Sequence, residues 1–276
     1  ALISPRGAIL GGQGALVQLG AKSLRQSILA PNITQIAGLG PEPAAGEIAE
    51  FYRTRQYPGS PMGVVALLRQ TYLDADGYRR RQEQYQRYPA QLERVPEDPV
   101  LHAMGALLDR KQMWIFAART PNEIHHALDL AKEFNQRVAI LGGAEAWKVV
   151  DRLSAERVPV IVSFDWDDKP ELAPKADEKK GKTEYTTVSW TPEFEMDFFE
   201  PLSIRRARIQ DWEDHVNNLH TLAAAGVPVA VTSRDNKDTK EFWTRAQEAL
   251  ELALEPAELL AALTTGPAAI YGMPDQ

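Results

Sequence analysis

Four short apolar runs, separated by helical stretches, constrain the fold more than any other feature of this sequence. The runs are rich in β-branched residues, and their hydrophobicity is continuous rather than alternating. Continuous hydrophobicity is typical of strands buried on both faces, as in a parallel sheet covered by helices. The runs lie at residues 113–118, 137–142, 158–164 and 227–232. Because repeated strand and helix units with short connections form βαβ units, we expect an α/β fold.

Capping signals between the runs support this interpretation. Thr120-Pro121-Asn122-Glu123 combines an N-cap threonine, a proline at the first helical position and a capping-box glutamate. Gly226 lies directly before the last run, where it predicts the end of the preceding helix.

The first 110 residues are less regular. We predict strands at 1–4 and 15–19 on either side of a glycine turn at 11–14, and helices at 61–75, 78–88 and 101–109. The basic run Arg79-Arg80-Arg81 lies among glutamine, tyrosine and acidic residues, and we interpret it as a solvated helix face rather than a nucleic-acid site.

Composition excludes several classes of protein. The chain has 276 residues, 44% of them hydrophobic, and a formal net charge of -7, which argues against nucleic acid or an anionic membrane as the main partner. No apolar run approaches the roughly 20 residues that span a bilayer. The lack of cysteine excludes disulfides, thiolate zinc sites and cysteine nucleophiles. Because the chain begins at Ala1 and stops abruptly at Gln276, we interpret it as part of a longer polypeptide.

A long insertion separates the third run from the fourth. Residues 165–204 contain four prolines, a stretch rich in lysine and glutamate at 175–184, and an aromatic and acidic patch at 190–199. Loops of this length are uncommon unless they are functional or mobile. We expect the middle of the insertion to be flexible and the aromatic patch either to pack on the fold or to bind a partner.

Several segments together resemble the amidohydrolase superfamily, in particular a divergent bacterial branch. They are Gly12-Gln13-Gly14-Ala15-Leu16-Val17, Tyr57-Pro58-Gly59-Ser60-Pro61-Met62-Gly63 with Ala66-Leu67-Leu68-Arg69-Gln70, Gly142-Gly143-Ala144-Glu145-Ala146-Trp147, and Ala262-Leu263-Thr264-Thr265-Gly266-Pro267-Ala268. The resemblance implies a distorted or incomplete (β/α)8 TIM-type barrel beside a small β-sandwich. The four runs would be its fifth to eighth strands. Residues 1–276 would then be a single barrel domain with an insertion at about 165–204, and the sandwich and the strand with the family's His-x-His pair would lie outside this chain.

The resemblance also implies where metal ligands should be. The family hydrolyses amide, cyclic amide and ester bonds with metal-activated water, and it carries histidines at the ends of the fifth and sixth strands. Here those ends carry Arg119 and Gly142-Gly143. After the last strand comes Arg234-Asp235, where the family usually has Ser-Asp or Thr-Asp, so Asp235 is a weak candidate for the catalytic aspartate. A single carboxylate without histidine partners is not a metal site.

The five histidines do not replace the missing ligands. His125 and His126 are adjacent and point in different directions, His215 and His220 are five residues apart on what we predict to be one helix, and His102 is isolated. We therefore expect no cofactor. Asp165-Trp166-Asp167-Asp168 is the better candidate for a cation, although clustered loop carboxylates are usually only solvated.

Positive side chains at the strand ends suggest a role other than metal binding. Arg119 and Arg234 each follow a strand, and Gly142 and Gly143 open the next helix with bare backbone N–H groups. We hypothesise that the arginines either pair with Asp165 and Asp235 to hold the barrel mouth or, with the glycines, bind a small anionic ligand.

Three functions stay open. The first is a noncatalytic pseudoenzyme or scaffolding domain whose partner is the rest of its own polypeptide or of an assembly. The second is a metal-dependent hydrolase with zinc or another divalent cation, and the third is a barrel that binds a small ligand or peptide through the aromatic insertion. The compartment does not follow from the residues, although related bacterial proteins are often exported to the periplasm.

Overall fold

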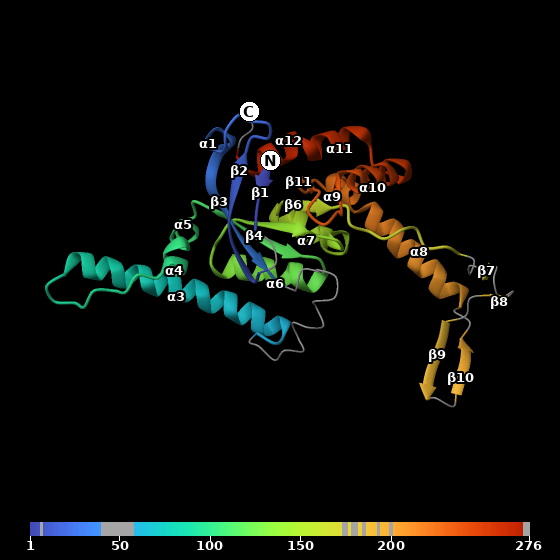
Figure 1. The fold of residues 1–276 in the computed structure, drawn as a ribbon, viewed down its shortest axis with the longest axis horizontal. Helices are drawn as coiled ribbons and strands as arrows, with labels where there is room; N and C mark the ends of the chain where they lie inside the picture. The colour runs from blue at the N-terminus through green and yellow to red at the C-terminus, as the bar shows by residue number, and fades with distance from the viewer. Residues whose placement is uncertain are drawn as a thin grey trace.

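A mixed seven-stranded sheet forms the centre of the molecule (Figure 1). The computed structural model describes residues 1–5, 8–39, 58–172 and 201–272, together with the backbones of four short strands between 176 and 198. In spatial order the strands of the sheet are β1 (Leu2–Ile3), β2 (Leu10–Val17), β3 (Ile28–Gly38), β4 (Met113–Ala118), β5 (Val138–Gly142), β6 (Val160–Ser163) and β11 (Val229–Thr232). The five strands from β3 to β11 are parallel, whereas β2 is antiparallel to both of its neighbours. The α/β class and the parallel sheet are thus confirmed.

The sheet curls until its two edge strands approach each other. Strands β1 and β11 are the edges, yet both line one hollow of about 450 Å³ on the concave face. Where these strands end, Arg234 Nη1 donates a hydrogen bond to Ser4 Oγ at 2.9 Å. The described part of the chain is therefore a half-barrel. It is compatible with a distorted TIM barrel, and a complete (β/α)8 arrangement stays a prediction.

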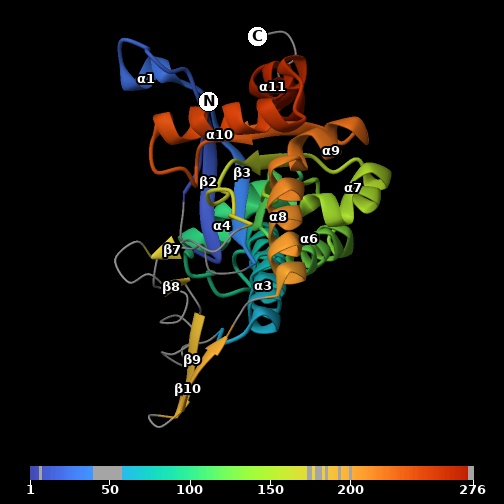
Figure 2. The ribbon, with the colours of Figure 1, turned by 90° about the vertical axis from the view of Figure 1, so that its right-hand side faces the viewer.

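The helices of the described residues are α1 (Leu24–Ser27), α3 (Pro61–Arg87), α4 (Pro99–Ala103), α5 (Gly105–Leu108), α6 (Pro121–Glu133), the 3-10 turn η1 (Ala146–Val149), α7 (Val150–Glu156), α8 (Leu202–Val216), α9 (Asn218–Ala224), α10 (Thr239–Leu252), α11 (Pro256–Leu263) and α12 (Thr265–Ile270). Those from α3 to α10 pack on the convex face of the sheet, where the larger hydrophobic core lies (Figure 2). Leu263 at the end of α11 and Pro267 of α12 instead line the concave hollow. None of the helices in the described part of the chain is long and apolar enough to cross a membrane.

Strand alternation divides the core into two parts. Along β4, Trp114 and Phe116 enter the larger core, whereas Met113 and Ile115 belong to a smaller cluster on the concave side. Successive side chains of a strand point to opposite faces, so burial of both sides requires the continuous hydrophobicity seen in the sequence. The capping box at Thr120 and Glu123 is present and begins α6 as predicted.

Helix α3 joins the two helices predicted at 61–75 and 78–88 into one. Ser60 caps it, and its outer half projects past the sheet (Figure 1). Arg79 pairs with Asp76 and Asp109, and Arg80 pairs with Asp76. The basic run is thus part of a network of surface ion pairs.

Two features of the N-terminal third differ from the sequence prediction. The glycines at 11, 12 and 14 lie within β2 rather than in a turn. Gly14 is required there because a Cβ would lie 2.4 Å from Thr34 Oγ1 on the neighbouring strand. Strand β3 was not predicted, although it joins the antiparallel and parallel parts of the sheet.

The insertion contributes no strand to the main sheet among its described residues. It contains β7 (Ala176–Asp177) paired with β8 (Lys182–Thr183), and β9 (Thr186–Thr191) paired with β10 (Phe194–Phe198), both antiparallel. The β9–β10 hairpin lies apart from the sheet in both views (Figures 1 and 2). The aromatic side chains of the 190–199 patch, and the predicted flexibility of residues 175–184, fall outside the described side chains.

Candidate functional site at the carboxyl ends of the strands

An ion pair joins the ends of two parallel strands. Arg119 follows β4, Asp165 follows β6, and Arg119 Nη1 donates to Asp165 Oδ2. The side chain of Asp165 is 9% exposed and that of Arg119 is 35% exposed. The sequence analysis offered this pairing as one way to hold the barrel mouth, and the pair does form.

The backbone around Arg119 is fixed by the start of the next two elements. Its N–H donates to Glu123 Oε2 at 2.7 Å, and its carbonyl accepts from the N–H of Glu145 at 2.9 Å. Because Glu123 also closes the capping box, the turn that carries Arg119 is tied both to α6 and to the loop after β5.

His215 completes this group from α8. Its Nε2 lies 4.0 Å from Asp165 Oδ1, and its ring lies 5.7 Å from that of Trp147 and 6.0 Å from that of Trp166 between centroids. Both facing atoms are buried and have no hydrogen-bond partner among the described residues. We call Arg119, Asp165, His215, Trp147 and Trp166 the strand-end cluster.

Burial keeps His215 neutral. Desolvation lowers the pKa of its imidazole below the ordinary value, and it outweighs the attraction of Asp165, Asp211 and Glu145, which raises that pKa. Arg119 lowers the pKa further through its positive charge. The cluster therefore holds one ion pair beside a neutral base.

The loop after β5 follows the strand that lies between β4, which precedes Arg119, and β6, which precedes Asp165. Gly142 and Gly143 have φ of +92° and +53°, and a Cβ on Gly143 would lie 2.8 Å from Val160 Cγ1. The N–H of Gly143 donates to the carbonyl of Ala118 at 2.8 Å, so it is not bare as the sequence analysis expected. The N–H of Gly143 is therefore already satisfied by a backbone carbonyl within the fold.

Asn218 anchors the same loop from α9. Its Nδ2 donates to the carbonyl of Gly143 at 2.8 Å, and its Oδ1 accepts from the N–H of Trp147 at 3.1 Å. The side chain is almost fully buried. The sequence analysis missed this residue, because an asparagine in a helical stretch has no pattern that marks it as a buried anchor.

Arg234 serves a different place from Arg119. Its backbone N–H donates to Thr232 Oγ1 at 3.2 Å, its Nη1 contacts Ser4, and it lines the concave hollow. Arg119 is not among the residues of that lining. Asp235 follows in an exposed turn. The binding roles predicted for Arg119, Arg234, Gly142, Gly143 and Asp165, and the catalytic role of Asp235, stay predictions.

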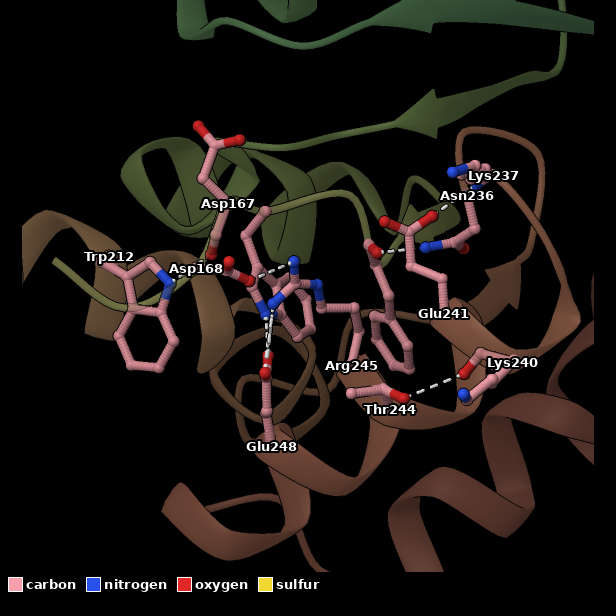
Figure 3. Close-up of polar contacts among 12 residues, drawn as sticks. Asp167, Asp168, Trp212, Asn236, Lys237, Lys240, Glu241, Thr244, Arg245 and Glu248 are labelled. Atoms are coloured by element: carbon pink, nitrogen blue, oxygen red, sulfur yellow. Dashed lines mark hydrogen bonds and ion pairs between the residues drawn. The ribbon is translucent and has the colours of Figure 1, made fainter.

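The acidic cluster after β6 does not converge on one point. Asp165 faces Arg119, whereas Asp168 is 94% exposed and pairs with Arg245 at 2.9 Å. Arg245 also pairs with Glu248 (Figure 3). Glu248 in turn accepts a hydrogen bond from Trp166 Nε1 at 2.8 Å. These contacts attach the loop to α10.

The described residues do not fit a metal centre of the amidohydrolase type. Within them, no three histidine, aspartate or glutamate side chains come together as a metal site. His125 Nδ1 lies 2.9 Å from Arg152, and His220 Nδ1 lies 2.8 Å from Glu258. His215 and His220 lie on two helices rather than one, as α8 ends before α9 begins.

Comparison with known proteins gives a likeness in fold. No family model and no curated protein matches the chain. It is similar to the crystal structure of an amidohydrolase from Thermotoga maritima MSB8, at 19% sequence identity and a TM-score of 0.72. The match covers 99% of this chain and 61% of that protein, so this chain spans about three fifths of its length. The fold of the described residues is thus amidohydrolase-like.

Proposed function

We propose that this chain is a noncatalytic amidohydrolase-like barrel domain that serves as a scaffold within a larger polypeptide or assembly. The observation that carries the proposal is the Arg119–Asp165 ion pair at the strand ends. In the family that the sequence resembles, a histidine ligand belongs where Arg119 stands.

Charge supports this proposal. Divalent cations are held by neutral imidazoles and carboxylates. A guanidinium at the same place repels the cation and also pairs with the nearest carboxylate, which is then no longer available as a metal ligand. Asp165 already accepts from Arg119, and the facing His215 is a single imidazole. The same ion pair has a structural use, because it links β4 to β6 across the intervening β5.

Metal analysis of the purified chain, prepared without chelators, tests the proposal. We expect far less than one zinc, nickel or manganese per chain, and no turnover of dipeptides, lactones or cyclic imides after these metals are added. Near-stoichiometric metal together with turnover would establish the metal-dependent hydrolase instead.

Two carboxylate variants make that test specific. Any hydrolysis by the family's chemistry is expected to depend on Asp235 and to disappear in Asp235→Asn. The matched control is Asp168→Asn, because Asp168 is almost fully exposed and outside the strand-end cluster. Activity lost only in Asp235→Asn overturns the proposal, whereas activity that is equal in the unchanged chain and in both variants does not come from the family's aspartate.

A further inference from the structure

The turn between β2 and β3 exposes apolar side chains beside two cations. Leu19 is 74% exposed, and Ile28 and Leu29 are 43% and 47% exposed. Lys22 and Arg25 are exposed as well, and neither forms an ion pair with a described residue. Exposed apolar residues that lie together, rather than singly, mark an interaction surface. We call these five residues the basic tip.

Helices α10 and α11 expose a second apolar surface, which carries anions. Leu250 and Leu252 are each 37% exposed, and Leu260 is 62% exposed. Glu251 and Glu255 lie between these leucines in the sequence and are exposed, and within the described part of the chain neither has a cation as its partner. We call these five residues the acidic face.

The sequence keeps the two signs of charge apart in these two regions. Residues 1–41 include Lys22 and Arg25 but no aspartate or glutamate, whereas residues 246–276 include Glu251 and Glu255 but no lysine or arginine. Ordinary protein surfaces intersperse the two signs. The basic tip and the acidic face are therefore complementary in charge, and both are apolar.

Both surfaces lie at the same end of the molecule. Helix α1, which forms part of the turn that carries the basic tip, and helices α10 and α11 are at this end in both views (Figures 1 and 2). The interface of a two-fold symmetric dimer is self-complementary, so each chain must present both halves of every contact on one face. A two-fold axis at this end places the basic tip of each chain on the acidic face of the other.

We propose that this end of the molecule is the interface of a symmetric dimer of the chain, in which the basic tip of each copy docks on the acidic face of its partner. An anionic membrane fits this end less well, because it attracts the basic tip but is repelled by the acidic face. The interface involves no residue of the strand-end cluster, so the proposal does not depend on the proposed function.

Sedimentation velocity of the full 276-residue chain measures this association directly. We expect an equilibrium between monomer and dimer at micromolar concentration. Salt screens exposed charges, so the dimer should weaken by about tenfold between about 0.05 M and about 0.5 M sodium chloride.

Charge reversal tests the complementarity of the two surfaces. The tip variant combines Lys22→Glu with Arg25→Glu, and the face variant combines Glu251→Lys with Glu255→Gln. Glutamine at position 255 keeps a side-chain oxygen for the capping box of α11. Each variant alone should dimerise at least about tenfold more weakly than the unchanged chain. An equimolar mixture of the two should form a heterodimer, because the reversed tip then meets the reversed face while the unchanged tip meets the unchanged face.

Matched controls on α3 separate these effects from a general change in charge or polarity. Arg81→Glu with Arg87→Glu reverses two exposed charges there and should leave the dissociation constant unchanged. Leu260→Asp should weaken the dimer about tenfold or more, whereas Leu73→Asp, at a leucine that is 51% exposed, should not weaken it.

The proposal is overturned if the chain stays monomeric at submillimolar concentration, or if it assembles into species larger than a dimer. It is equally overturned if the mixture of the tip and face variants associates no better than either variant alone, or if Leu260→Asp weakens the dimer no more than Leu73→Asp does. A monomeric chain that binds vesicles of phosphatidylglycerol, and loses this binding in the tip variant, would identify a membrane surface as the partner instead. Stoichiometric metal would refute the scaffold proposal and leave the dimer as predicted, so the two proposals fail separately.

Discussion

Replacing Arg119 by glutamine tests whether the strand-end ion pair stabilises the fold. Asp165 is 9% exposed, so without Arg119 its carboxylate would lie in a poorly solvated place beside a neutral imidazole. Breaking a fully buried pair costs about 3–5 kcal/mol, and an exposed pair contributes about 0–1 kcal/mol. Because Arg119 is 35% exposed, solvent screens part of its interaction, and we expect Arg119→Gln to lower the free energy of unfolding by about 2 kcal/mol.

Urea unfolding followed by circular dichroism measures this change, and Arg69→Gln supplies the matched control. Arg69 pairs with Glu133 through three hydrogen bonds, yet both side chains are more than two fifths exposed. Its removal should cost about 1 kcal/mol or less. Equal losses in the two variants would refute the view that burial of Asp165 makes the strand-end pair stronger.

A double-mutant cycle separates the pair from other effects of the substitution. Asp165→Asn removes the buried charge, so adding it to Arg119→Gln should recover part of the lost stability, with a coupling of about 1–2 kcal/mol. NMR titration of His215 gives an independent measurement. Its pKa should rise in Arg119→Gln, which removes a cation, and fall in Asp165→Asn, which removes an anion. A coupling near zero, a fall of the His215 pKa in Arg119→Gln or a rise of that pKa in Asp165→Asn would contradict the arrangement described for the cluster.

Three further predictions concern single side chains, and urea unfolding measures each of them. Gly266→Ala should destabilise by more than about 2 kcal/mol because its Cβ would lie 2.1 Å from the carbonyl oxygen of Val229, whereas Gly77→Ala, in open space on α3, should stabilise by about 0.5–1 kcal/mol. Asn218→Leu should cost about 1–3 kcal/mol because it removes the acceptor of the Trp147 N–H and one of the two hydrogen bonds to the carbonyl of Gly143, which keeps the bond from the N–H of Ala146. His215 has a lowered pKa in the folded state, so as pH falls through about 6.5 the unfolded state takes up a proton that the folded state does not. Stability should then decrease by up to about 1.4 kcal/mol per pH unit, and His215→Gln should remove this dependence.

The parallel strands could be predicted from the sequence because a single physical requirement governs each of them. A strand covered on both faces must be apolar at every position, and β4 begins and ends at the residues that this pattern predicts. Helix α6 was equally predictable, since Thr120 and Glu123 specify its first turn through local hydrogen bonds.

Strand β3 could not be predicted because only its second half meets that requirement. Residues 28–33 are largely exposed, and they include Pro31 and Asn32, whose φ is +55°. Such residues are typical of a loop. From Thr34 onward the strand is buried and pairs with β4, so it is tertiary pairing rather than local preference that makes this segment extended. The glycines of β2 were misinterpreted as a turn for the same reason.

The residues of the candidate site also differ in whether the sequence could predict their position. Arg119 and Asp165 could be related from the sequence, because the ends of parallel strands meet at one edge of a sheet. His215 and Asn218 could not, because they lie on α8 and α9, whose position depends on how these helices pack after a long insertion.

The alternation of side chains along the strands also separates the two hydrophobic clusters of the core. In β6, Val160 and Val162 enter the outer core, whereas Ile161 faces the hollow. A change in Ile161 therefore alters the size of the hollow and leaves the packing under the helices intact. We expect Ile161→Val to lower the free energy of unfolding by about 0.5–1.5 kcal/mol, because the side chain borders the hollow. Val162→Ala should cost more, about 2–3 kcal/mol, because the outer core cannot relax around it. Equal losses of stability in the two variants would contradict the separation of the concave cluster from the outer core.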